Sequence, residues 1–199
     1  DVANLRKNLN WNNEPFVIDQ DVYDFYHENV TKRGLKAHQE WNKLYAEYSK
    51  KYPEEAKLFE TFIKNDLKVD LKEFDKLDQT KPSATRNVSG NVLSILSSKY
   101  LNLIGGSADL TSSTKAKGAD GNFEASNHLG RNINYGVREH AIGAIANGIT
   151  LHGGLKSFTG AFFVFSDYMK PAIRLAAIMN IPTIFVFSHD SIAVGEDGP

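Results

Sequence analysis

Apolar residues recur at helical spacing in the first part of the chain. One stripe follows the i, i+3, i+4, i+7 spacing of a single helix face. It consists of Trp41, Leu44, Tyr45 and Tyr48. Pro53 stands where a second helix would begin. The apolar face of that helix consists of Phe59, Phe62 and Ile63. Stripes of this kind are usually packing surfaces, so residues 1–80 are predicted to form a helical appendage or linker.

After the break at Lys81-Pro82-Ser83, predicted helices alternate with short apolar segments that predict strands. Helices are expected over 85–100, 138–152 and 163–180, and strands over 101–104, 157–159 and 183–187. The pair Gly105-Gly106 is expected to close the first strand. The run 183–187 (TIFVF) is typical of a parallel strand that is buried on both faces. The residues expected on the inner face of the second helix are Ala141, Ile142, Ile145 and Ile149.

This alternation predicts an α/β fold with a doubly wound, mainly parallel sheet, preceded by the helical linker. In such sheets, ligands bind beyond the carboxyl ends of the strands. The loops at these ends are predicted over 105–113, 134–139, 159–168 and 188–199. A functional site is therefore expected where these loops meet.

Composition narrows the class of protein without identifying it. The chain has 199 residues, 41% of them hydrophobic and 24% charged, which is typical of a globular protein. A net charge of −1 gives no reason to expect nucleic acid or an anionic membrane as a partner. The absence of cysteine excludes disulfides and thiolate zinc sites and is consistent with a cytoplasmic protein. The chain starts without Met and stops at GEDGP, so we expect a piece of a longer protein.

Common catalytic and nucleotide-binding motifs are absent from the sequence. It contains no G-x-x-x-x-G-K-[ST] loop, no G-x-G-x-x-G after a strand, no H-E-x-x-H and no G-x-S-x-G. The six histidines do not fall at zinc-ligand spacing. A simple hydrolase or an NAD enzyme is therefore disfavoured.

The segment YGVREH, 135–140, places the carboxylate of Glu139 at the predicted start of an apolar helix, after a glycine turn. A carboxyl group in such a position can protonate a ring nitrogen, which is the step that activates thiamine diphosphate. The alternative is that Glu139 only complements the helix N-terminus, an effect of about 0.3–1 kcal/mol.

Three segments together resemble the transketolase family. They are GGSADL at 105–110, YGVREHAIGAIANGITLHGG at 135–154 and SHDSIAVGEDGP at 188–199. The resemblance identifies 81–199 as a pyrimidine-binding domain, truncated on its C-terminal side. Residues 1–80 resemble the helical linker and the tail of the preceding diphosphate-binding domain.

The resemblance implies a transferase that uses thiamine diphosphate and Mg²⁺ or Ca²⁺, with the metal ligands in a domain that this chain lacks. It implies transfer of a two-carbon ketol unit in the pentose phosphate pathway, from xylulose 5-phosphate to ribose 5-phosphate or erythrose 4-phosphate. A homodimer with active sites at the subunit interface, in the cytoplasm, is implied as well. The isolated chain is expected to be inactive.

The resemblance also assigns roles to individual residues. Glu139 would exchange a proton with the aminopyrimidine ring. The aromatic wall for that ring would consist of Phe162, Phe165 and Tyr168, whose spacing is helical and would by itself favour core packing. The residues approaching the thiazolium side would be Asp109 and Leu110. The substrate-binding residues would be Arg86 and Ser113 for the phosphate, His189 for hydroxyl or phosphate groups, and Asp197 for a sugar hydroxyl.

Two alternatives remain at this stage. One is a different thiamine diphosphate enzyme, of the dihydroxyacetone synthase or deoxyxylulose-phosphate synthase type. The combination of Arg86, Ser113 and Asp197 favours ketol transfer between sugar phosphates over that alternative. The other is a non-catalytic module that keeps the fold, which would have no need for Glu139 together with the aromatic residues.

Overall fold

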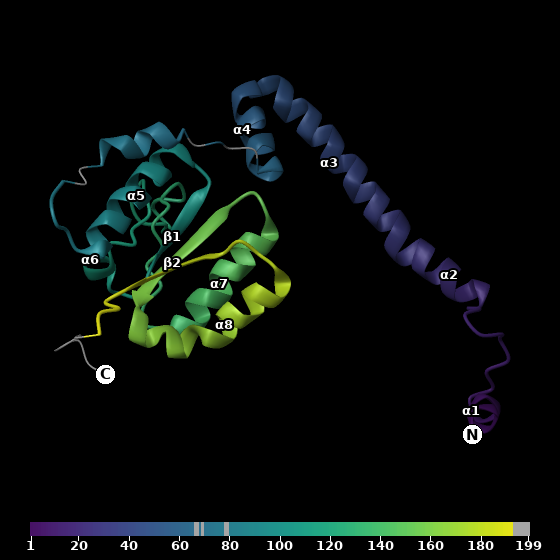
Figure 1. The fold of residues 1–199 in the computed structure, drawn as a ribbon. Helices are drawn as coiled ribbons and strands as arrows, with labels where there is room; N and C mark the ends of the chain where they lie inside the picture. The colour runs from purple at the N-terminus through teal and green to yellow at the C-terminus, as the bar shows by residue number, and fades with distance from the viewer. Residues whose placement is uncertain (66–67, 69, 78–79, 193–199) are drawn as a thin grey trace. The chain divides into compact units, whose positions relative to one another are not determined.

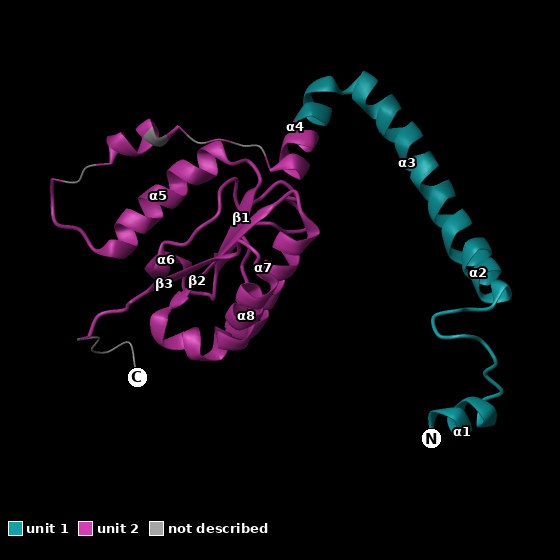
Figure 2. Ribbon diagram, turned by 45° about the vertical axis from the view of Figure 1, so that its right-hand side comes forward, with its two compact units in different colours: residues 1–57 teal, residues 58–199 magenta. Residues whose placement is uncertain are grey.

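The computed structural model describes residues 1–65, 68, 70–77 and 80–192. The chain forms two compact units, residues 1–57 and residues 58–199, which Figure 2 distinguishes by colour. The first unit is helical. Its elements are α1 (Val2–Asn8), α2 (Gln20–Tyr26), a π-helical turn η1 (His27–Thr31), α3 (Lys32–Lys51) and the beginning of α4 (Pro53–Lys64). No helix within the described ranges is long and apolar enough to cross a membrane.

The predicted helices of the first unit are confirmed. α3 contains the predicted stripe, and two of its rings, Trp41 and Tyr45, stack with centroids 5.9 Å apart. Trp41 is 50% exposed and Leu44 is 60% exposed, so the stripe is mostly uncovered within this unit. α4 begins at Pro53, as the sequence predicts, because proline is favoured in the first helical turn.

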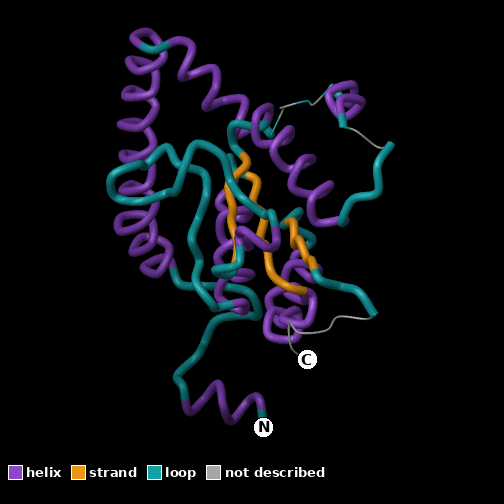
Figure 3. Tube along the Cα trace, turned by 90° about the vertical axis from the view of Figure 1, so that its left-hand side faces the viewer, coloured by secondary structure: helices purple, strands orange, loops and turns teal. Residues whose placement is uncertain are grey.

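The second unit is built around a three-stranded sheet. Its elements in chain order are the end of α4, η2 (Leu71–Lys76), α5 (Thr85–Lys99), β1 (Leu103–Ser107), α6 (Thr111–Thr114), α7 (Glu139–His152), β2 (Lys156–Phe162), η3 (Phe163–Phe165), α8 (Ser166–Met179) and β3 (Ile184–Ser188). The strand order is β1-β2-β3, and both pairings are parallel. Figure 3 shows the strands side by side between helices.

Helices pack on both faces of this sheet, which confirms the predicted α/β class. α5 and α6 lie on one side, and α7 and α8 lie on the other (Figure 1). Each face has its own buried cluster. The cluster on the α5 side contains Leu93, Leu103, Ala116 and Phe158. The cluster on the α7 side contains Ala108, Tyr135, Ile142, Ala161 and Met169. Alternate residues of β2 and β3 supply the two clusters, as the pleat of a strand requires.

The first strand differs from its prediction. β1 runs through Gly105 and Gly106 instead of ending at them. A Cβ atom on Gly105 would lie 2.1 Å from the backbone oxygen of Phe158, and one on Gly106 would lie 1.9 Å from that of Ile133. The glycines therefore permit a close approach of neighbouring backbone within the sheet, and they do not mark its end.

Two further expectations are wrong in detail. β3 is only partly buried, with Ile184 44% exposed, because it has β2 on one side and no other described strand on the other. The buried face of α7 is rotated relative to the predicted one. It consists of Glu139, Ile142, Gly143, Ala146 and Asn147, whereas Ile145 is 47% exposed. Helix α8 packs closely at Gly143, where an added Cβ would lie 2.7 Å from the Cβ of Ala172.

A long loop between α6 and α7 is anchored by Arg131, whose side chain is 11% exposed. Its guanidinium donates to the backbone oxygens of Ser97 (2.9 Å) and Tyr100 (2.8 Å), at the C-terminal end of α5. It also donates to the carboxylate of Asp120, at 2.6 Å. These bonds satisfy helix-end carbonyls and hold the loop against α5.

Candidate functional site

The carboxyl-end loops meet around a cavity of about 560 Å³, called here the Glu139 cavity. Its lining consists of Ala108, Asp109, Leu110, Val137, Glu139, Phe162, Phe165 and Tyr168. Every residue that was predicted to bind the cofactor is in this set. Ala108 and Val137 line the cavity too and were not predicted. Both are small or medium apolar residues, whose type alone gives no functional signal.

Glu139 is the first residue of α7, and only 8% of it is exposed. Its carboxylate has no hydrogen bond or ion pair within the described part of the chain, although it lines the cavity. The free N–H groups of a helix start favour a negative charge there. A carboxylate that faces a cavity without a protein partner is nevertheless available to a ligand that carries a donor or a basic nitrogen.

The aromatic residues of the cavity come from three successive elements, although their spacing is helical. Phe162 ends β2, Phe165 ends η3 and Tyr168 lies in α8. The rings of Phe162 and Phe165 are 6.0 Å apart with planes at 10°, and those of Phe165 and Tyr168 are 6.2 Å apart with planes at 29°. Phe162 is 7% exposed and Tyr168 is 65% exposed, so the stacked series extends from the interior to the surface. A flat ring can lie against such a wall.

Asp109 follows β1 by two residues and has an unusual backbone conformation. Its φ is +60°, a left-handed value that is uncommon outside glycine and is often found at functional sites. The end of β1 is held in place by β2, since the amide of Ala108 and the hydroxyl of Ser107 both donate to the oxygen of Gly160, each at 2.9 Å. The strand end and Asp109 are thereby fixed relative to Phe162, two residues further along β2.

Tyr135 belongs to the buried cluster that adjoins the cavity and was not predicted as a site residue. It is 5% exposed and belongs to the buried cluster on the α7 side. Ala108, from the same cluster, lines the cavity itself. Two other members of the cluster, Ala161 and Met169, are next in sequence to the lining residues Phe162 and Tyr168. Its hydroxyl has no hydrogen-bond partner in the described residues, and burial raises its pKa to about 12. The signal that could have revealed it is its place as the first residue of YGVREH.

The residues predicted to grip a phosphate also come together. The guanidinium of Arg86 donates to Nε2 of His189 at 2.8 Å and to the backbone oxygen of Ser113 at 3.5 Å. The contact with Ser113 thus uses its carbonyl and not its hydroxyl. Because arginine can only donate, Nε2 of His189 must accept. The ring proton then lies on Nδ1, which is 2.9 Å from the hydroxyl oxygen of Ser188.

His189 connects this group to the Glu139 cavity. Its ring lies 3.8 Å from that of Phe162, with the planes at 31°. Its φ is +58°, so the residue after β3 has the same left-handed conformation as Asp109, two residues after β1. Arg86, Ser113 and His189 are each partly buried, which leaves their polar groups accessible beside the aromatic wall. Asp197, predicted to contact a sugar hydroxyl, lies outside the described residues.

The described ranges contain no group of three or more His, Cys, Asp or Glu side chains that could hold a metal ion.

Two family models match the chain. The model for the transketolase pyrimidine-binding domain matches residues 81–199, and the model for the transketolase thiamine diphosphate-binding domain matches residues 1–68. Among curated relatives, the transketolase of Bacillus subtilis is 48% identical over 189 residues. That match covers 94% of this chain and 28% of the relative, so the chain spans less than a third of the relative's length.

Solved transketolase structures have the same fold. The structure from Leishmania mexicana has a TM-score of 0.84 and 36% identity, and the match covers 100% of this chain and 30% of that one. The Pichia stipitis enzyme, in complex with sedoheptulose 7-phosphate, has a TM-score of 0.81 and 38% identity, with coverages of 94% and 29%. Since the pyrimidine-domain model alone matches more than half of its residues, the chain belongs to the transketolase family.

Proposed function

We propose that this chain forms the aminopyrimidine-binding part of an enzyme that transfers a two-carbon ketol unit between sugar phosphates. The donor would be xylulose 5-phosphate, and the acceptors would be ribose 5-phosphate and erythrose 4-phosphate, as in the pentose phosphate pathway. The observation that carries the proposal is the Glu139 cavity, where the buried carboxylate of Glu139, which has no partner among the described residues, lies beside three stacked aromatic rings. Family membership agrees with this assignment.

The residues of the cavity fit the aminopyrimidine of thiamine diphosphate. The wall of Phe162, Phe165 and Tyr168 suits a flat heteroaromatic ring, and a volume of about 560 Å³ is within the usual range for a small-molecule site. Glu139 faces the cavity from the start of α7. Thiamine diphosphate, when bound, supplies the carbanion chemistry that amino acid side chains lack.

Glu139 would hold and return a proton at a ring nitrogen of the bound group. Phe162 and Phe165 would orient the ring so that this nitrogen meets the carboxylate. Asp109 and Leu110, which also line the cavity, would approach the second ring of the cofactor. A carboxylate that is only 8% exposed interacts more strongly with such a partner than an exposed one would, because water screens it less.

Arg86, Ser113 and His189 would bind the phosphate of the sugar. The guanidinium of Arg86 has donors to spare beyond its bonds to His189 and Ser113, and arginine is well suited to phosphate recognition. His189 lies against Phe162, so a sugar phosphate held by this group would lie next to the ring-binding wall. The Pichia stipitis relative was solved with a sugar phosphate bound, which supports this substrate class.

The remaining parts of the proposal concern the assembled enzyme. A divalent cation, Mg²⁺ or Ca²⁺, would bind the diphosphate outside this chain, and active sites would form between the two subunits of a homodimer in the cytoplasm. The 199-residue chain alone would not transfer ketol units, since it spans only 28% of a relative such as the Bacillus subtilis enzyme.

The test is a chimera in which this chain replaces the matching segment of the Bacillus subtilis transketolase. With thiamine diphosphate and Mg²⁺, it is expected to transfer ketol units from xylulose 5-phosphate to ribose 5-phosphate. Glu139→Gln is expected to lower kcat by about 100-fold or more, because general acid–base catalysis contributes that much.

Glu55→Gln is the matched control, since Glu55 is also in the first turn of a helix. If Glu139 served only to complement its helix, both variants would lose a similar small amount of stability and keep their activity. That result, or a chimera that binds the cofactor without transferring ketol units, would overturn the proposal.

A further inference from the structure

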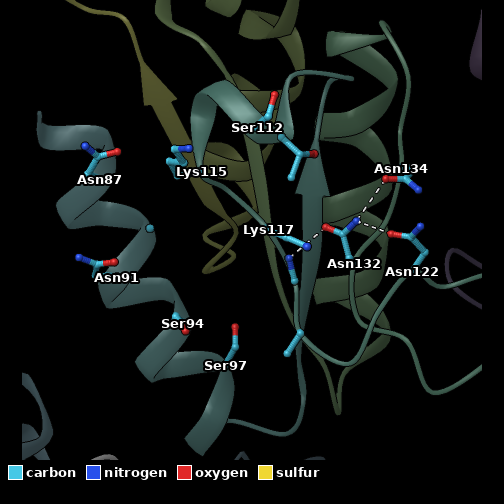
Figure 4. Close-up of a pocket in the computed structure, with 14 residues that line it drawn as sticks. Asn87, Asn91, Ser94, Ser97, Ser112, Lys115, Lys117, Asn122, Asn132 and Asn134 are labelled. Carbon is cyan, nitrogen blue, oxygen red and sulfur yellow. Dashed lines mark hydrogen bonds between the residues drawn. The ribbon is translucent and has the colours of Figure 1, made fainter.

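A second, larger cavity lies between α5 and the loop that follows α6. Its volume is about 910 Å³, and it is called here the α5 cavity. Figure 4 shows its polar lining. One wall is a single face of α5, with side chains three or four residues apart. This wall consists of Asn87, Asn91, Ser94 and Ser97. The side across from this wall consists of Asn122, Asn132 and Asn134, and Ser112, Lys115 and Lys117 lie between the two.

A network of amide groups orders one side of this cavity. The oxygen of the Asn132 side chain accepts from the amide of Gly118 at 3.0 Å. Its nitrogen donates to the side-chain oxygens of Asn122, at 2.9 Å, and Asn134, at 3.2 Å. Since Asn122 and Asn134 accept through their oxygens, their amide nitrogens are left as donors without a partner in the described part of the chain.

Ser97 provides an independent sign of a ligand. It is 2% exposed, and its hydroxyl has no hydrogen-bond partner among the described residues. Figure 4 shows its oxygen directed along the helix face toward the cavity. Buried hydroxyls are nearly always paired, because an unpaired one loses its hydration without compensation. A ligand or ordered water in the cavity would satisfy it.

The charge of the lining is positive. Among the described residues, Lys115 and Lys117 are the lining residues that carry charge, and none of the lining residues is acidic. Neither lysine forms an ion pair or side-chain hydrogen bond with the described residues. The backbone of Lys115 is fixed close to α5, since a Cβ on Gly90 would lie 2.7 Å from its Cβ. Two ammonium groups and several amide and hydroxyl donors favour an anion that also carries hydroxyl groups.

We propose that the α5 cavity binds a phosphorylated polyhydroxyl compound. Lys115 and Lys117 hold the phosphate, and the asparagine and serine side chains of α5 and of the Asn132 network bind the hydroxyls. These residues differ from Arg86, Ser113 and His189, so the two groups can be tested separately. The proposal does not depend on the activity of the Glu139 cavity.

The experiment is isothermal titration calorimetry of the 199-residue chain with glucose 6-phosphate, inorganic phosphate and glucose, after circular dichroism has verified the fold of each variant. We expect glucose 6-phosphate to bind more tightly than phosphate, and glucose to bind least. The double variant Lys115→Gln/Lys117→Gln is expected to weaken glucose 6-phosphate binding by about tenfold or more, because hydrogen bonds to charged groups are lost. Ser97→Ala should weaken it by a smaller factor.

Two controls separate this cavity from other cationic groups. Lys81→Gln removes an exposed lysine outside the cavity and should not change the affinity. Arg86→Gln removes the guanidinium of the other phosphate-binding group, so glucose 6-phosphate binding that persists in this variant, and is lost when the double lysine change is added, belongs to the α5 cavity. The proposal is overturned if the wild-type chain does not bind glucose 6-phosphate, or if glucose binds equally well. It is also overturned if Arg86→Gln abolishes binding while the double lysine variant retains it.

Discussion

Replacing Arg131 by Met tests how the loop that carries one wall of the α5 cavity is held in place. Methionine keeps much of the buried volume but removes the bonds to the backbone oxygens of Ser97 and Tyr100 at 2.9 and 2.8 Å. Hydrogen bonds from a charged donor contribute about 1.5–3 kcal/mol each, so the expected loss for the two is about 3 kcal/mol or more. In a chain of this size, that lowers Tm by about 6–12 °C.

The comparison with Asp120→Asn shows whether the stability comes from the buried bonds of Arg131 to backbone oxygens or from its ion pair with Asp120. The side chain of Asp120 is 57% exposed, and an exposed partner contributes only about 0.2–1 kcal/mol. Urea unfolding followed by circular dichroism gives the free energy of unfolding of both variants. The reasoning is refuted if Arg131→Met costs less than about 1 kcal/mol, or if Asp120→Asn destabilises the chain as much as Arg131→Met does.

Three further changes are predicted. Burial raises the pKa of Tyr135 to about 12, so the stability that its neutral form contributes is complete below pH 10 and is lost as the pH rises toward 12. Tyr135→Phe should reduce that alkaline loss, as measured by urea unfolding at about pH 9 and 11.5. Gly105→Ala should destabilise the chain by about 2 kcal/mol, since its Cβ would overlap a backbone oxygen of β2. Gly148→Ala, where nothing lies within 4 Å, should be neutral or stabilising. In the chimera, Phe165→Ala should weaken thiamine diphosphate binding by about 2- to 12-fold through lost stacking, and Phe163→Ala should not.

Each of these has a contrary outcome. Equal alkaline unfolding of wild type and Tyr135→Phe would mean that the pKa of Tyr135 is the same in the folded and the unfolded chain. Equal stability of Gly105→Ala and Gly148→Ala would show that the sheet can shift at β1 to make room for the added methyl group. Unchanged cofactor affinity in Phe165→Ala would remove the aromatic wall from the proposed function.

Much of the second unit could be predicted from the sequence because its signals are local. Helix α7 starts at Glu139 after the glycine turn, and β2 and β3 lie in the apolar segments that were predicted to be strands. The alternation of these elements was sufficient to predict a parallel sheet with helices on both faces. The cavity residues Asp109, Glu139 and Phe165 came from motif resemblance, and the structure brings them together around one cavity.

Local signals did not show which elements the aromatic residues of the cavity occupy, or which face of α7 is buried. The spacing of Phe162, Phe165 and Tyr168 is helical, yet the rings come from a strand end, a 3-10 turn and a helix, and they stack because β2 leads directly into α8. The exposed face of α7 was misjudged by periodicity because the close packing of α8 at Gly143 determines which face is buried.

The sequence by itself determined the order of helices and strands, the parallel sheet and the position of Glu139 at a helix start, because spacing and turn residues act over a few neighbours. The tertiary structure decided what depends on contacts between distant segments. The bond from Arg86 to His189 joins residues 103 positions apart, and the Arg131 side chain reaches back 34 positions to Ser97. No local pattern encodes such pairs, since they form only when the sheet has placed the strand ends and α5 side by side.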